Sequence, residues 1–288
     1  SSNNPNGATF YLDEIKYDKS RPDEPRFLVS YEALSSTNPD SPDRPIKNTS
    51  YIYDNALALM TFLARGNDED LRRAKILADA FVYARNNDRH YTDGRLRNAY
   101  RSGDMIDHLT GKAKIPGWWD PVDKKWQEDK LQISTHTGNL AWTMIALLRY
   151  YEKAGGAPYL EAAEALGEWI ERETRDTRCA GGYTGGYEGG EPDPQKIDWK
   201  STEQNIAVYA AFMLLHELTG DTKWKERALH AKNFVNAMWN DAIEHFWTGT
   251  PNDGCNINRD NIPVDIQALA MMATGHYDSA IRWVENNC

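Results

Sequence analysis

Positive charge, cysteine and long apolar runs are all scarce in this chain. Of its 288 residues, 33 are Lys or Arg and 43 are Asp or Glu, which gives a net charge of −10. Nucleic acids and anionic membranes are bound through clustered Lys and Arg, so this balance argues against both partners. No apolar run approaches the roughly 20 residues of a membrane-spanning helix. We therefore expect no nucleic-acid partner and no membrane partner.

The three cysteines, Cys179, Cys255 and Cys288, fit no metal-binding spacing. Either one disulfide forms in an oxidising compartment and leaves one thiol over, or all three remain thiols. We expect no metal centre and no cofactor, with one exception left open. The loop "NDGCNINRD" (252–260) offers several oxygen ligands that would suit calcium, although its spacing is not that of an EF-hand.

A helical layout recurs four times along the chain. In each copy a nearly all-apolar helix is followed by a break at Gly and by a second, amphipathic helix, as in "YDNALALMTFLARGNDEDLRRAKILADAFVYA". A helix that is apolar all round must be surrounded by protein, whereas an amphipathic helix covers one face only. The apolar helices are expected over 56–63, 140–148 and 206–215, with a shorter fourth. Asn55, Asn139, Asn205 and Asp265 stand at matching places near the starts of these helices.

Inner apolar helices paired with outer amphipathic helices predict an all-α fold, an α/α toroid of helical hairpins. We expect the toroid domain over 50–288. The alternating "ATFYLDEIKYD" (8–18) predicts a short β segment, so that 1–20 is the end of a preceding β-domain or a linker. The Pro-rich stretch that follows predicts an extended linker or loop over 21–49.

Three long loops are expected to lie at one end of the array. They span 89–131, 179–200 and 240–261, and each joins an outer helix to the next inner helix. Loops of this length inside a compact domain are usually functional. The end that carries them therefore also collects many of the Trp, Tyr, Asp and Arg residues.

The hairpin repeat, the helix start "YDNALA" and the Gly-rich "GGYTGGYEG" before "WKSTEQN" resemble the six-hairpin glycosidase superfamily of (α/α)6 toroids. The resemblance covers about 50–288 and implies a secreted or periplasmic carbohydrate-active enzyme. That family closes its ring with six hairpins, and four are recognisable here. We therefore expect an incomplete toroid, whose ring is completed by the remainder of a longer polypeptide or by another chain.

Hydrolysis of a glycosidic bond needs two carboxyl groups across a sugar-binding cleft. Asp54, Glu203 and Asp265 are the candidates, because each begins an inner helix at the loop-bearing end. An alternative explains them equally: acids in the first turn of a helix interact favourably with its free N–H groups. "STEQ" also resembles a capping box, with Ser201 as the cap and Gln204 three residues on. Both interpretations of the acids remain open at this point.

Aromatic rings stack on the C–H faces of sugars, while acids and amides bind sugar hydroxyls. The loops and helix starts provide a set of candidates with these chemistries. The predicted substrate-binding residues are Tyr53, Trp118, Trp119, Asp104, His136, Tyr183, Tyr187, Trp199 and Trp247.

The function predicted first is a glycoside hydrolase acting on a polysaccharide or oligosaccharide. A polysaccharide lyase or a sugar epimerase on a similar toroid is the alternative, since His136, Asn139, Tyr100 and Arg101 could serve a lyase. A glycan-binding protein without catalysis is a further alternative from a different class. A lack of product release combined with retained glycan binding would distinguish it.

Overall fold

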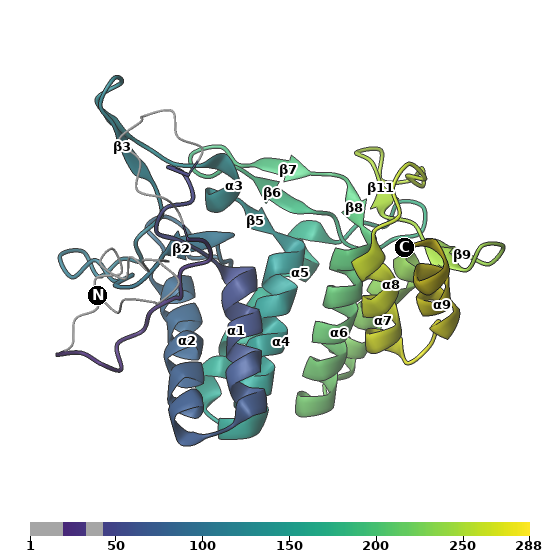
Figure 1. The fold of residues 1–288 in the computed structure, drawn as a ribbon, viewed down its shortest axis with the longest axis horizontal. Coiled ribbons are helices and arrows are strands. Elements are labelled where there is room, and N and C mark those ends of the chain that lie inside the picture. The colour runs from purple at the N-terminus through teal and green to yellow at the C-terminus, as the bar shows by residue number, and fades with distance from the viewer. Residues whose placement is uncertain (1–19, 33–42) are drawn as a thin grey trace, which may run out of the picture.

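The computed structural model describes residues 20–32 and 43–288, which form four helical hairpins capped at one end by short strands (Figure 1). The inner helices are α1 (Ile52–Arg65), α4 (Thr137–Ala154), α6 (Thr202–Thr219) and α8 (Val264–Thr274). Their outer partners are α2 (Asp68–Asn86), α5 (Ala157–Thr174), α7 (Thr222–Ala237) and α9 (Asp278–Asn287). The predicted apolar segments 56–63, 140–148 and 206–215 lie inside α1, α4 and α6. The predicted β segment 8–18 falls outside the described residues.

The inner helices lie side by side in the order α1, α4, α6, α8, and each outer helix packs on its own inner helix. All four inner helices start at the end that carries the strands (Figure 1). Within the described part of the chain, α1 and α8 do not pack closely against each other, so the hairpins form a row. This arrangement points the amino ends of four helices in one direction.

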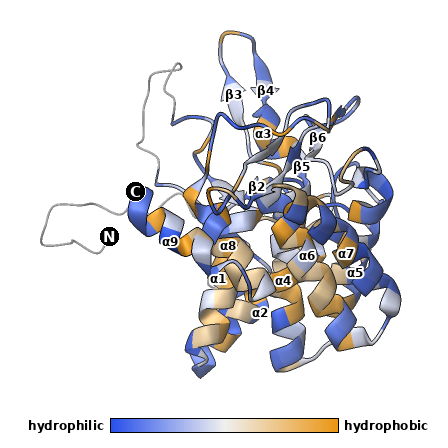
Figure 2. Ribbon diagram, turned by 90° about the vertical axis from the view of Figure 1, so that its right-hand side faces the viewer, coloured by the Kyte–Doolittle hydropathy of each residue, from blue (hydrophilic) through white to orange (hydrophobic). Residues whose placement is uncertain are grey.

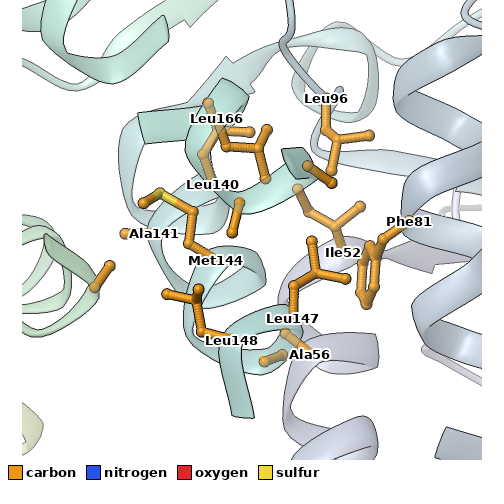
Figure 3. Packing of buried hydrophobic residues seen from close by; sticks show 14 of the residues in the cluster. Ile52, Ala56, Phe81, Leu96, Leu140, Ala141, Met144, Leu147, Leu148 and Leu166 are labelled. Atoms are coloured by element: carbon orange, nitrogen blue, oxygen red, sulfur yellow. The ribbon is translucent and has the colours of Figure 1, made fainter. Parts of the chain in front are cut away.

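The main hydrophobic core lies between the inner helices and their outer partners. Leu140, Met144 and Leu147 of α4 are fully buried, and they meet Ile52 of α1 and Leu166 of α5 (Figure 3). Apolar residues follow the helices, whereas the strand-bearing end is largely hydrophilic (Figure 2). No helix within residues 20–32 and 43–288 combines the length and apolarity that crossing a membrane requires.

The hairpins turn where the sequence places glycine. Gly66 ends α1 with a φ of 67° and Gly220 ends α6 with a φ of 71°, and each donates its N–H to the carbonyl four residues earlier. Residues with a Cβ rarely adopt this left-handed conformation, so glycine allows the short connection to the outer helix.

A buried side-chain amide fixes the start of three inner helices in the same way. Each amide oxygen accepts a backbone N–H from one loop residue, and each amide nitrogen donates to the carbonyl of that same residue. Each nitrogen also donates to the carbonyl four residues before it. The pairs are Asn55 with Leu28, Asn205 with Tyr183, and Gln267 with Phe246.

This repeat corrects the alignment made from sequence. The residue of α8 that corresponds to Asn55 and Asn205 is Gln267, and not Asp265. Glutamine can replace asparagine here because both side chains end in the same amide group. In the corrected register, the position two residues before the buried amide is occupied by Tyr53 on α1, Glu203 on α6 and Asp265 on α8.

The long loops form small sheets above the helix starts, as expected for loops gathered at one end. The described strands form four antiparallel pairs, β1–β2, β3–β4, β8–β11 and β9–β10, and one three-stranded antiparallel sheet, β5–β6–β7. A short helix, α3 (Lys130–Ile133), lies among them. The strands are β1 (Thr49–Tyr51), β2 (Ala99–Arg101), β3 (Trp118–Asp120), β4 (Lys125–Gln127), β5 (Thr135–His136), β6 (Gly186–Glu188), β7 (Gln195–Ile197), β8 (Lys200–Ser201), β9 (Trp239–Asn240), β10 (His245–Phe246) and β11 (Gly249–Thr250).

Buried ion pairs hold the first two long loops together. Arg97 is fully buried and donates to Asp88 at 2.7 and 2.9 Å, and it also lies 2.9 Å from Glu191 in the second loop. Burial alone would lower the pKa of Arg97, but its acidic partners outweigh this effect and raise the pKa. Burial would raise the pKa of Glu191, but its arginine partners outweigh burial and lower that pKa to about 2. Removing one member of such a buried set leaves an uncompensated charge, so the loops are fixed relative to each other.

The described part of the predicted linker 21–49 packs on the toroid domain. Phe27 is only 2% exposed and stacks on Tyr100, with ring centroids 5.8 Å apart. Leu28 is the loop residue that pairs with Asn55. The segment is irregular in its described residues, yet it completes the core around α1 and α2.

Candidate active site

Side chains from three inner helices converge at the strand-bearing end of the row. The negative charges of Glu203 on α6 and Asp265 on α8 both raise the pKa of Tyr53 on α1, after the larger effect of burial. Both acids affect Tyr53 more than its own neighbour Asp54 does. Coulomb interactions decline with distance, so the starts of α1, α6 and α8 lie close enough for these charges to act on Tyr53. The corrected repeat register accounts for this convergence.

Glu203 is the acid with the most altered environment in this group. Its side chain is half-buried, and its pKa is raised, first by burial and second by the negative charge of Asp265. Both effects disfavour the ionised form. Glu203 therefore keeps its proton to higher pH than an ordinary glutamic acid.

Asp265 has the opposite surroundings. It is exposed in the first turn of α8, and its Oδ1 accepts the N–H of Ile266 at 3.0 Å. The two acids therefore differ in environment, because Glu203 is half-buried and Asp265 is exposed.

Trp142 of α4 completes the group, and the sequence reading missed it. Its ring meets the Tyr53 ring edge-on, with centroids 5.6 Å apart. Its indole N–H is buried and makes no hydrogen bond of normal length within the described residues. It is still near enough to Glu203 to lower the pKa of that carboxyl slightly. Trp142 falls within the apolar segment predicted over 140–148, where nothing in the spacing separates a site aromatic from a core aromatic.

Capping of α6 does not use the Glu203 carboxyl. Ser201 caps the helix, since its Oγ accepts the N–H of Gln204 at 3.3 Å, as the capping-box pattern predicted. The Gln204 side chain accepts the N–H of Gly138 on α4 at 3.2 Å and so links two inner helices. The simple capping explanation therefore accounts for Ser201 and leaves Glu203 available.

Asp54 remains a predicted site residue, but it does not occupy the repeat position of Glu203 and Asp265. It lies one residue after Tyr53, at the repeat position that Gln204 occupies on α6. On α6 that position reaches back towards the preceding helix of the row, and α1 has no preceding helix among the described residues. The charge of Asp54 also raises the pKa of Tyr53, after burial and after the charges of Glu203 and Asp265.

His136 and Trp199 lie in contact with each other at the same strand-bearing end of the row. His136 precedes α4, and its ring meets Trp199 nearly edge-on with centroids 6.3 Å apart. Burial lowers the pKa of His136, and the charge of Glu188 opposes this effect only in part. His136 is therefore a neutral imidazole near pH 7.

Three other predicted sugar contacts make packing or hydrogen-bond contacts within the protein, and burial of Tyr183 and Trp247 corrects their prediction as exposed sugar contacts. Tyr183 is fully buried, and its hydroxyl donates to Glu171 at 2.6 Å, so it belongs to the core. Tyr187 donates to Glu173 and its ring packs on Trp169 of the outer helix α5. Trp247 is 9% exposed and packs on His245, with ring centroids 4.3 Å apart.

The remaining predicted contacts lie away from the carboxyl pair. Trp118 and Trp119 belong to the β3–β4 hairpin, which stands out from the helical body (Figure 1). Trp119 is 56% exposed and pairs across the hairpin with Trp126. Asp104 lies beside the Phe27 bridge to Gly103, and its buried Oδ1 has no partner in the described part of the chain.

Within residues 20–32 and 43–288, no group of three or more His, Cys, Asp or Glu is arranged to hold a metal ion. In the loop considered for calcium, Asp253 accepts the backbone N–H groups of Cys255 and Asn256 and forms a turn. The calcium expectation stays a prediction.

Comparison with known proteins identifies the fold. No family model matches the sequence, and no curated protein matches it. An alpha-amylase from Clostridium perfringens is similar in structure, with a TM-score of 0.62 and 10% identity over 96% of this chain and 68% of that one. A sugar epimerase from a ruminal bacterium gives a TM-score of 0.59 and 16% identity over 96% of this chain and 65% of that one. A GH76 alpha-mannanase from Bacteroides thetaiotaomicron gives 0.51 and 16% identity over 81% and 59%.

These likenesses show that the chain shares its overall fold with the amylase, epimerase and mannanase structures. At identities of 10–16% they establish the fold and leave the activity open. The chain spans 65% of the length of the epimerase structure and 68% of the amylase structure.

Proposed function

We propose that this chain is a carbohydrate-active enzyme, and more specifically a glycoside hydrolase that acts on a polysaccharide or oligosaccharide. The observation that carries the proposal is the pairing of Glu203, whose pKa is raised, with the exposed Asp265 on the next inner helix. Glycoside hydrolysis needs one protonated and one ionised carboxyl group. Glu203 would protonate the leaving oxygen, and Asp265 would activate water or attack the anomeric carbon.

Tyr53 and Trp142 supply the aromatic surface that a sugar ring needs beside these acids. Their rings are edge-on to each other. Among the described residues, no acceptor forms a hydrogen bond of normal length with the indole N–H of Trp142. A sugar hydroxyl or the Glu203 carboxylate formed after proton transfer can accept that N–H. A hydrogen bond from the indole to either acceptor would be stronger in a partly desolvated site than in water.

The similar structures support the coarser part of the proposal. They include proteins named as an alpha-amylase, an alpha-mannanase and sugar epimerases, which all act on carbohydrates. Hydrolysis rather than epimerisation is our inference from the two carboxyl groups. The direct experiment is to incubate the protein with a panel of neutral and acidic glycans and to measure new reducing ends.

The pH profile of activity should have a descending limb set by Glu203. Because its pKa is raised, the protonated form that donates to the leaving oxygen persists above the usual value of about 4.3 and is lost at higher pH. We expect kcat/KM to fall as pH rises through this raised pKa. A substrate with a good aryl leaving group, which needs no proton, should show a much flatter limb. An equally steep fall of kcat/KM with rising pH for both substrates would contradict the role of Glu203 as the acid.

A sugar epimerase is the second candidate, and His136 is the observation that favours it. A neutral imidazole at the start of an inner helix can take a proton from a carbon next to a carbonyl group. An epimerase would incorporate solvent deuterium into a reducing sugar without producing new reducing ends. A lyase would instead give an unsaturated product that absorbs ultraviolet light.

We also propose a secreted or periplasmic location. The pairing left open by the sequence is resolved in the structure, where Cys179 bonds to Cys255 and Cys288 is the exposed free thiol. Structural disulfides persist mainly in oxidising compartments. Detection of the oxidised form in protein isolated from its native source would test this proposal.

A further inference from the structure

A cavity opens beside the start of α6, between the β8–β11 strand pair and the loop that follows β11. Its volume is about 410 Å³, within the usual range for small-ligand sites. The residues that bear on its chemistry are Trp199, Ser201, Thr248, Thr250, Asn252 and Asn258. We call it the Asn258 cavity.

The lining of the Asn258 cavity suits an uncharged polyhydroxyl ligand. It combines one indole ring with hydroxyl and amide groups, and no carboxylate belongs to it. The only charged residue, Lys200, is fully buried, and its ammonium donates to the carbonyl of Gly181 at 2.9 Å. It also lies 3.4 Å from Asp176. The lysine charge is thus compensated within the protein, so an acidic ligand has no cation to meet here.

Two groups of the cavity have unused hydrogen-bonding capacity. The hydroxyl of Thr250 is buried and lacks a hydrogen-bond partner among the described residues. Asn258 uses its Oδ1 to accept the N–H of Asp260, which orients the side chain. Its amide nitrogen remains as a donor, and amide donors suit sugar hydroxyls.

The cavity lies at the start of α6, the helix that carries Glu203. Ser201 lines the cavity and caps α6, and Glu203 follows two residues later. Trp199 lines the cavity and also meets His136, the residue that precedes α4. A chain of sugar units could therefore extend from the cavity towards Glu203.

We infer that the Asn258 cavity is a remote subsite for one neutral sugar unit of an oligosaccharide or polysaccharide whose other units reach Glu203. This inference rests on the proposed function for the direction of the glycan, and it specifies the substrate class. It favours a neutral glycan of several units over a uronic-acid polymer or a free monosaccharide.

The test uses the full chain carrying Glu203→Gln, so that binding is measured without turnover. Cello-, malto- and manno-oligosaccharides of two to six units are titrated by calorimetry, with oligogalacturonides as the acidic comparison. We expect affinity for one neutral series to rise with length. Asn258→Leu should then weaken binding of the longest oligosaccharide by about five- to tenfold, the value of one hydrogen bond. Asn261 is an exposed neighbour in the same loop and does not line the cavity, so Asn261→Ala should leave the affinity for the longest oligosaccharide unchanged.

The outcomes separate this inference from the proposed function. Turnover by the wild-type protein with no effect of Asn258→Leu on affinity would overturn the subsite and leave the hydrolase proposal standing. Binding that weakens in Asn258→Leu, with no turnover of any glycan by the wild type, would support the subsite and contradict the hydrolase. Preference for oligogalacturonides, or no binding of any neutral series, would overturn the subsite.

Discussion

Glu203→Gln is expected to lower kcat on glycans by about 10²–10⁴-fold, the usual contribution of a general acid. Glutamine keeps the size and the half-buried position of the side chain but cannot donate the proton. Glycan affinity should be largely retained, because the indole of Trp142 and the ring of Tyr53 are unaffected. Reducing-end assays and calorimetry on the same preparation measure the two quantities.

The matched control is Glu217→Gln, an exposed acid on the same helix α6 but near its opposite end. Its kcat and its glycan affinity should equal those of the wild type. A second check uses a substrate with an activated aryl leaving group, for which Glu203→Gln should cost far less activity. If both variants lose activity equally, or if neither does, Glu203 is not the proton donor.

Removing the disulfide is expected to cause the largest loss of stability. The Cys179–Cys255 bond links positions separated by 76 residues. Closing a loop of this size stabilises a fold by about 4 kcal/mol in the chain-entropy description. We expect Cys179→Ser with Cys255→Ser to lower the free energy of unfolding by about this amount in urea titrations.

Cys288→Ser is the control, because Cys288 is exposed and unpaired. Addition of a reductant should destabilise the wild type and the Cys288→Ser variant, and it should not change the double variant further. Equal stability of the double variant and the wild type would show that the bond is not formed in solution. It would also remove the support for a secreted or periplasmic location.

The helices were predictable because their signal is strong and repeated. Apolar runs of three to four turns, ended by residues such as Gly66 and Gly220, specify inner helices without long-range information. The strands were not predictable, since each has only two or three residues and is set by pairing between loops. Tyr183 illustrates the same limit: its Gly-rich surroundings suggest an exposed loop, but Asn205 and Glu171 hold it inside.

The placement of the candidate acids was predictable in part, and their chemical role stays a prediction. Position at a helix start predicts that Asp54, Glu203 and Asp265 lie at one end of the array, because the inner helices point in the same direction. The sequence cannot choose between Tyr53 and Asp54 as the α1 residue that corresponds to Glu203, since a shift of one residue on a helix turns a side chain by about 100°. That distinction required the register of the buried amides Asn55 and Asn205.

The central claim is that the carboxyl groups of Glu203 and Asp265 face each other across the starts of α6 and α8. Carboxyl-carbon NMR titration of Glu203, in the wild type and in Asp265→Asn, tests it most directly. The account predicts a Glu203 pKa above about 4.3 in the wild type, and a lower pKa in Asp265→Asn because the nearby negative charge is gone. An ordinary Glu203 pKa that does not respond to Asp265→Asn would contradict the claim.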